Sequence, residues 1–335
     1  MAIINPYSGL NWNSALQITS CSHEHCEYQS VMDRITANSW IQHLAISNYY
    51  PSEPCYPMTY TIPEGCIASP NAEHHNMKIG GVSKPSMHLN SLGSTFQSGS
   101  PQGETPVGCG GANCEDIIPQ IFSALQYSDA GGLTINHPIW TGLKTKDVEY
   151  LLDFDDRVLG MEIFNASSTF GNSQGQGADP TDLQRQIEMW DDILLTGRRC
   201  WGFCVADHWG EYSEDWQGRN VLLVPSLTEY NCLRAYRTGA FYGRLKNTNL
   251  VFTSITFSNY SLSVKTQNAD NIKIIIDKQV TTHNNNSVTQ KIPMGATYVR
   301  VEAHNENDSI YSNPITLKTK DDKDNFIKQA VMVLM

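Results

Sequence analysis

The sequence predicts an α/β protein in which a mainly parallel sheet or barrel is followed by a small antiparallel β-sandwich. Short apolar runs alternate with helix-like segments between about residues 16 and 207, a pattern typical of parallel sheets and barrels. These runs end in His, Glu, Asp or Asn. From Leu250 onward, short strands of alternating polarity are separated by Asn-rich turns, which indicates an antiparallel β-sandwich.

The first apolar run, Leu16–Ser20, leads into two histidines that are one residue apart, His23 and His25. Side chains at i and i+2 point to the same side of an extended backbone, so both imidazoles can bind one cation. Imidazole is a frequent protein ligand for zinc, iron and manganese. This segment is therefore a candidate metal site, although a pair of surface histidines gives the same local pattern.

Further apolar runs along the chain end in similar polar residues. We expect helices over residues 31–39, 116–127, 145–153, 182–196 and 228–238, and strands over 41–47, 131–136, 158–164 and 201–206. In an α/β barrel the site is built where the strands end. The candidate site residues at these ends are His23, His25, Asn48, Glu73, His88, His137, Glu162, Asp207 and His208.

The pattern divides the chain into an expected barrel-like domain, residues 1–244, and a small β-domain with a C-terminal tail, residues 245–335. The strands expected in the second part cover residues 251–257, 261–266, 271–277, 297–304 and 312–318.

Composition excludes some function classes. The 335 residues carry a formal net charge of -11, which disfavours a protein that binds nucleic acid by neutralising phosphates. No run of 18 apolar residues predicts a membrane span, and no export signal is recognisable, so we expect a cytoplasmic protein whose nine cysteines are reduced. Cys200 and Cys204 flank an apolar run and are expected to be buried thiols rather than half of a zinc knuckle. The oligomeric state stays open.

The order of five short motifs resembles the PHP (polymerase and histidinol phosphatase) family of metal-dependent phosphoesterases. The lead-in 5–12 and the segment 234–242 resemble a branch of this family that carries a small C-terminal β-domain. The five motifs are the His23/His25 pair, His137-Pro138, Glu162–Asn165, the helix Trp190–Gly197 and the VADHWG segment with Asp207 and His208.

The resemblance implies a distorted (β/α)7 barrel with one to three divalent ions, Zn, Mn or Fe, at the strand ends, and a small phosphorylated substrate. Three motifs depart from the family pattern. The usual HxHT is followed by a Ser-Asp-Gly turn, whereas here His23-Glu24-His25 is followed by Cys26-Glu27. The usual Thr-Asp-His is replaced by Ser47-Asn48-Tyr49, and the usual Asp-x-His by the adjacent Asp207 and His208. Asn48 offers only an amide oxygen, a weaker ligand.

Two cations roughly 3.5–4 Å apart can activate a water and neutralise phosphoryl oxygens. In this hypothesis Glu73 bridges the ions, and His208 or His75 donates a proton to the leaving oxygen or binds phosphate. His23, His25 and Asp207 or His208 hold one ion, whereas His88 and His137 hold the other. The alternatives are an amide or ester hydrolase on the same fold and a non-catalytic binding protein with a degenerate metal site.

Overall fold

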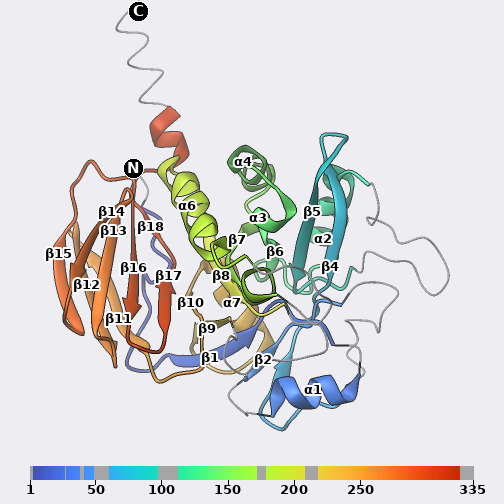
Figure 1. Cartoon of the computed structure of the whole chain (residues 1–335), viewed down its shortest axis with the longest axis horizontal. Coiled ribbons are helices and arrows are strands. Elements are labelled where there is room, and N and C mark those ends of the chain that lie inside the picture. The colour runs from blue at the N-terminus through green and yellow to red at the C-terminus, as the bar shows by residue number, and fades with distance from the viewer. Residues whose placement is uncertain are drawn as a thin grey trace, which may run out of the picture.

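The computed structural model describes residues 3–26, 28–37, 41–48, 60–96, 112–171, 179–207 and 218–324. Within these ranges the chain is a mixed α/β protein that is rich in strands (Figure 1). The strands form three sheets, and none of the three closes on itself. The α/β class is confirmed, but the closed (β/α)7 barrel is not.

A five-stranded sheet lies in the order β4-β5-β6-β7-β8. The first three strands pair antiparallel, and β6, β7 and β8 pair parallel. The strands are β4 (Glu73–Ile79), β5 (Val82–Leu92), β6 (Gly132–Ile135), β7 (Val158–Asn165) and β8 (Trp201–Val205). The sequence did not predict the long β4–β5 hairpin, because register shifts within it and Pro85 obscure the period-2 pattern.

A ten-stranded sheet lies in the order β14-β13-β16-β17-β10-β9-β1-β2-β3, with β18 paired to β16. Only β1, β2 and β3 are parallel in it. These strands are β1 (Leu16–Cys21), β2 (His43–Leu44), β3 (Ile67–Ala68), β9 (Arg219–Val224), β10 (Phe241–Arg244), β13 (Asn271–Ile276), β14 (Gln279–His283), β16 (Tyr298–His304), β17 (Ser309–Ser312) and β18 (Ile315–Thr316). A third, antiparallel sheet holds β11 (Val251–Ser258), β12 (Ser261–Gln267) and β15 (Ser287–Lys291).

The five predicted helices are confirmed to within a few residues. α6 ends before Gly197, whose φ of 84° suits the left-handed residue that follows many helices. Two short helices, α3 and α5, were not predicted. The helices are α1 (Gln29–Thr36), α2 (Cys114–Ser123), α3 (Pro138–Thr141), α4 (Thr145–Phe154), α5 (Ala166–Phe170), α6 (Asp182–Leu195) and α7 (Glu229–Thr238).

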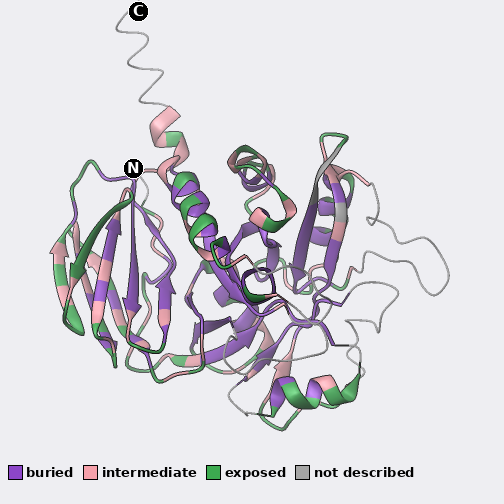
Figure 2. Cartoon of the chain, viewed as in Figure 1, coloured by how far each residue is buried: buried purple, intermediate pink, exposed green. Residues whose placement is uncertain are grey.

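Burial follows this layering. One core lies between the five-stranded sheet and helices α2, α4 and α6, and a second lies between the C-terminal antiparallel sheets (Figure 2). Cys200 and Cys204 are fully buried free thiols, as predicted. None of the described helices combines the length and apolar character needed to cross a bilayer.

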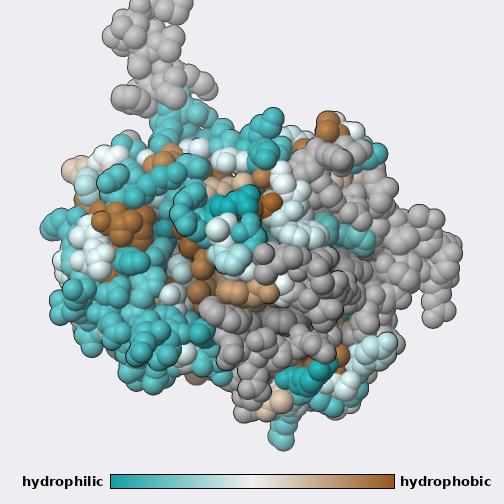
Figure 3. All heavy atoms as spheres, in the orientation of Figure 1, coloured by the Kyte–Doolittle hydropathy of each residue, from teal (hydrophilic) through white to brown (hydrophobic). Residues whose placement is uncertain are grey.

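The ten-stranded sheet runs across the predicted domain boundary at residue 245. β10 pairs with β17, where Tyr242 lies opposite Ser312, and Ile4 near the N-terminus pairs with Thr316. The two parts therefore share one hydrogen-bonded sheet. The division into domains 1–244 and 245–335 stays a prediction. The surface over the C-terminal strands is mostly hydrophilic, with a hydrophobic patch among them (Figure 3).

Individual hydrogen bonds link the five-stranded sheet to the ten-stranded sheet, outside the regular hydrogen-bond ladders of either sheet. Gly93 N donates to Pro70 O at 2.7 Å, between the residues after β5 and those after β3. On the other side, Cys204 N in β8 donates to Asn220 Oδ1 in β9 at 3.1 Å. Asp207 N then donates to His23 O at 3.0 Å. These bonds bring the C-terminal ends of β1 and β8 together, and that end of the molecule holds the candidate site.

Candidate metal centre

β1 delivers His23 and His25 to one side of the chain, as the i, i+2 spacing predicts. The intervening Glu24 points the other way, and its Oε2 lies 3.3 Å from Nη2 of the buried Arg219. Ser47 Oγ also accepts a hydrogen bond from Glu24 N at 3.0 Å. The segment that carries both histidines is thus held on its other side by a buried ion pair and by a hydrogen bond to the segment after β2.

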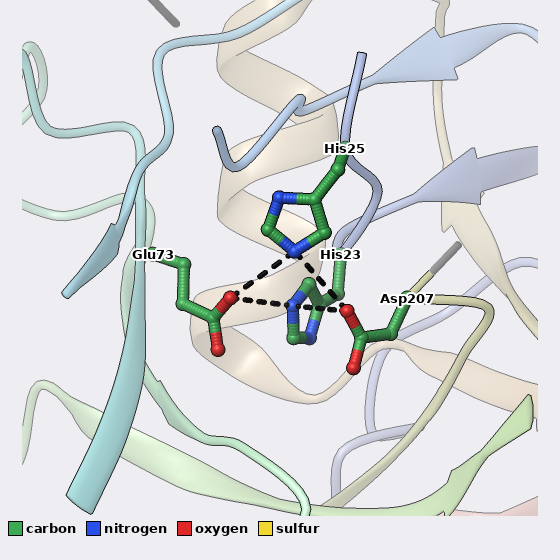
Figure 4. Close-up of side chains that lie close together, drawn as sticks. All are labelled: His23, His25, Glu73 and Asp207. Atoms are coloured by element: carbon green, nitrogen blue, oxygen red, sulfur yellow. Dashed lines mark hydrogen bonds and ion pairs between the residues drawn. The ribbon is translucent and has the colours of Figure 1, made fainter. Parts of the chain in front are cut away.

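Four side chains from three parts of the chain form a first group of potential ligands. His23 Nε2 and His25 Nε2 each lie 3.2 Å from Glu73 Oε2. The same two nitrogens lie 3.0 and 3.1 Å from Asp207 Oδ1. Figure 4 shows the two carboxylates on either side of the two imidazoles. One ligand atom from each residue lies within 4.8 Å of all the others, a grouping that can hold a metal ion.

The second group shares Glu73 with the first. Glu73 Oε1 lies 3.0 Å from His88 Nδ1 and 3.3 Å from His137 Nε2. Glu73, His88 and His137 also satisfy the 4.8 Å criterion for a metal-binding group. The two oxygens of one buried carboxylate therefore face two different sets of imidazoles.

The donors present suit a divalent transition metal. Within the described part of the chain, His23 Nε2 and Glu73 Oε2 are fully buried and make no hydrogen bond of acceptable geometry. The only described ion-pair partners of Glu73 and Asp207 are histidines. Two lone-pair atoms this close are unfavourable in a buried site unless a proton or a cation lies between them, and a bound divalent cation would satisfy both.

Glu162 lies behind His23 rather than in either ligand group. Its Oε1 is 2.6 Å from His23 Nδ1, and its Oε2 accepts from His137 N at 2.7 Å and from Asn165 Nδ2 at 2.9 Å. When Nδ1 donates to this carboxylate, the lone pair of the neutral His23 ring is on Nε2 and faces Glu73 and Asp207. Glu162 is thus placed to orient His23 and lies outside both ligand groups, and its predicted role as a metal ligand stays a prediction.

Two asparagines orient the carboxylates of the first group. Asn165 Nδ2 donates to Asp207 Oδ2 at 2.9 Å, and Asn136 Nδ2 donates to Glu73 Oε1 at 3.0 Å. The sequence analysis did not give either residue a role at the site. Their position is the available signal: Asn136 directly precedes His137, and Asn165 is the last residue of β7.

The charges inside the site shift the pKa values of its histidines. Burial alone lowers the pKa of His23, but the charges of Asp207, Glu73 and Glu162 outweigh it and raise the pKa well above the usual value. Burial lowers the pKa values of His25 and His137 as well, but the neighbouring carboxylates outweigh burial and raise both pKa values. Burial raises the pKa of Asp207, but the histidines outweigh it and lower the pKa. The cluster thus draws in positive charge, either as protons or as a cation.

Asn48 and His75 are predicted site residues that belong to neither of the two ligand groups. Asn48 is buried, and its amide accepts from Cys26 N at 2.6 Å and donates to Cys26 O, so it ties two loops together instead of facing the cluster. His75 is half-buried beside His88, with ring centroids 5.8 Å apart. His208 lies outside the described residues. Glu73 begins β4 and His88 lies within β5, so neither is the strand tip that was predicted.

Comparisons with known proteins give one distant likeness. No family model matches the chain, and no curated protein matches it. A crystal structure of a two-domain protein from Bacteroides vulgatus ATCC 8482, described as containing a predicted PHP-like metal-dependent phosphoesterase, is similar with a TM-score of 0.44 and 9% sequence identity. The similarity covers 92% of this chain and 89% of that one, and it is too distant to assign the chain to a family.

Proposed function

We propose that this chain is a metal-dependent hydrolase that cleaves phosphate esters with two divalent ions. The observation that carries the proposal is the position of Glu73, whose Oε2 faces His23 and His25 while its Oε1 faces His88 and His137. His23, His25 and Asp207 would hold one ion, and His88 and His137 the other. When bound, such ions activate water and neutralise the oxygens of a phosphoryl group.

The chain's own residues have three tasks in this proposal. Glu162 orients His23, and Asn165 and Asn136 orient Asp207 and Glu73 through the hydrogen bonds given above. His75, beside His88, takes part in proton transfer. Burial and the neighbouring His88 lower the pKa of His75, so its ring is neutral near pH 7 and suits a proton acceptor better than the proton donor expected from the sequence.

The motif order favours phosphate esters over amides or carboxylic esters, since those motifs resemble phosphoesterases. The use of Asn48 by the Cys26 backbone favours two ions over three. Two alternatives stay open, a metal hydrolase with another substrate and a non-catalytic metal-binding protein.

Elemental analysis and turnover of phenyl phosphate, phenyl acetate and an anilide test the proposal together. We expect two equivalents of metal in the wild type, about one in Asp207→Asn and in His88→Asn, and less than one in Glu73→Gln. Phosphate release should exceed ester and amide cleavage and should be lost in Glu73→Gln. Glu188→Gln, at an exposed position of α6, is the matched control. A wild type that binds metal without turnover favours the binding protein, and full metal content in Glu73→Gln contradicts a shared carboxylate.

A further inference from the structure

The short helix α3 holds a tryptophan beside the second ligand group. Trp140 follows His137 by three residues, and Pro138 and Ile139 between them pack inward, Pro138 being buried and Ile139 lying against the main core. The turn is closed by hydrogen bonds from Thr141 N to His137 O at 3.2 Å and from Leu143 N to Pro138 O at 2.9 Å. Trp140 is therefore presented on a rigid turn and loses little entropy when it binds a partner.

Trp140 is exposed, unlike the other described tryptophans. Its exposed fraction is 45%, whereas Trp190 and Trp201 are at 0% and 1% and Trp12 is partly buried. The exposed indole leaves a large apolar area in contact with water, and stacking against another ring would remove part of that area from solvent.

The indole lies against both histidines of the second group. Its ring centroid lies 5.0 Å from that of His137 and 5.8 Å from that of His88, and the two imidazole centroids are 5.0 Å apart. Both imidazoles therefore lie on the same side of the indole. Within the described residues, Trp140 has no other ring contact, and 45% of its surface remains exposed.

The cluster reaches solvent at His88, next to Trp140, and at Asp207 in the first ligand group. The side chains of His88 and Asp207 are 10% and 13% exposed, whereas those of His23 and Glu73 are at 0%. A substrate that reaches the second ligand group by way of His88 passes close to the exposed Trp140, whose ring centroid lies 5.8 Å from that of His88. On this approach the indole offers an apolar ring surface to the non-phosphate part of the substrate.

We propose that Trp140 is a stacking platform for a flat unsaturated ring on the alcohol side of the phosphate ester. The inference rests on the proposed function and narrows its substrates to aryl-type esters, in preference to small aliphatic ones. Stacking of a planar ring on an aromatic side chain strengthens binding by about 5- to 150-fold in the case of nucleic-acid bases. The competing explanation is that Trp140 only packs against His88 and His137 and so supports the metal ligands.

Substrate pairs separate the two explanations. In the metal-loaded full-length protein, Trp140→Ala should lower kcat/KM for phenyl phosphate by about tenfold, mainly through KM, and leave ethyl phosphate within about twofold. Trp140→Phe should recover most of the loss. Tyr150→Ala, which removes an exposed ring on α4, is the control and should change neither substrate. Equal losses for both esters, or a fall in metal affinity in Trp140→Ala, would show a packing role and overturn the proposal.

A binding measurement keeps this result separate from the proposed hydrolysis. Phenylphosphonate and methylphosphonate cannot be hydrolysed as esters, and calorimetry gives their affinities for the metal-loaded protein. A phenyl preference that disappears in Trp140→Ala supports the platform even when no phosphate ester turns over, in which case only the hydrolase proposal fails. Equal affinity of the wild type and Trp140→Ala for phenylphosphonate overturns the platform, whatever the activity.

Discussion

Two of the candidate ligands, His137 and Asp207, adopt backbone conformations that are unusual for residues with a Cβ. Their φ angles are 24° and 54°, and the other described non-glycine residues with positive φ lie in turns between C-terminal strands. Such conformations cost about 1–3 kcal/mol each and persist only where the surroundings hold them. Here Glu162 accepts a hydrogen bond from His137 N, and His23 O accepts one from Asp207 N. The same interactions that hold these strained residues also hold the cluster together.

Glu162 therefore gives a residue-scale prediction. Glu162→Gln keeps the size of the side chain but removes the charge that orients His23, so we expect metal affinity to fall by about 10–100-fold. Isothermal titration with Zn²⁺ or Mn²⁺ measures it, with Glu188→Gln as the control and circular dichroism to check the fold. Unchanged affinity would show that His23 needs no partner at Nδ1.

His43 predicts how stability depends on pH. Its ring lies 2.7 Å from Ser20 Oγ and 2.8 Å from Ser69 Oγ, and burial lowers its pKa to about 3. In the unfolded chain a histidine titrates near about 6.5. Below that pH the histidine is protonated in the unfolded chain but stays neutral in the folded protein. The free energy of unfolding therefore falls as the pH drops from about 6.5 toward 3, by roughly 1.4 kcal/mol per pH unit.

His43→Gln should remove this contribution. We expect the variant to be less stable than the wild type at neutral pH, since it disturbs buried hydrogen bonds, but to lose less stability on acidification. Urea unfolding of the metal-free proteins at about pH 7, 6 and 5 gives the change in the free energy of unfolding with pH for the wild type and for His43→Gln. The same pH dependence in both proteins would mean that the pKa of His43 does not change on folding.

At the scale of elements, α6 is joined to β16 by a buried ion pair. Arg300 donates from Nε and Nη2 to the two oxygens of Asp191 at 2.8 Å each, and its guanidinium lies 5.0 Å from the Trp190 ring. Tyr298 OH donates to the same carboxylate at 2.8 Å. This buried ion pair therefore joins helix α6, in the first part of the chain, to the C-terminal strands.

The adjacent Asp192 provides a matched comparison. Asp191→Asn removes one of the two carboxylates that pair with the buried Arg300, the other being Glu302, so we expect the free energy of unfolding to fall by about 1–3 kcal/mol. Asp192 pairs with Lys278 at the surface, and Asp192→Asn should cost less than about 1 kcal/mol. Urea unfolding measures both variants. Similar losses in the two would mean that burial does not strengthen the Asp191 pair.

At the scale of the whole molecule, one sheet connects both predicted domains. The buried Asn313 accepts from Gly202 N at 2.8 Å and donates to Gly239 O and Phe241 O at 3.0 and 3.2 Å. It therefore links the C-terminal strands to β8 and to β10. Because β10 lies between β9 and β17 in the same sheet, neither part can lose its strands without exposing an edge of the other.

Calorimetry should therefore show a single unfolding transition. Asn313→Ala leaves buried backbone groups without partners, and we expect it to lower the stability of that one transition by about 1–3 kcal/mol. Asn307→Ala, on an exposed turn, should leave it unchanged. Two separate transitions, with only the smaller one sensitive to Asn313, would instead support independent domains divided at residue 245.

The sequence alone determined the features that depend on local periodicity. The five long helices, the strands β6, β7 and β8, and the i, i+2 histidine pair follow from residue spacing, because helices and strands fix which side chains share a face. Local reading failed where that spacing is interrupted, as in the β4–β5 hairpin, and where a strand is short or buried on both faces, as in β10 and β9.

The tertiary structure decided how the candidate residues are divided. It placed Glu73 between two sets of histidines, moved Glu162 behind His23, turned Asn48 toward Cys26 and left Trp140 exposed beside His88 and His137. Sequence order could not separate these cases, because each depends on which strand ends meet in space. That meeting is set by hydrogen bonds and packing between residues as far apart as 23 and 207.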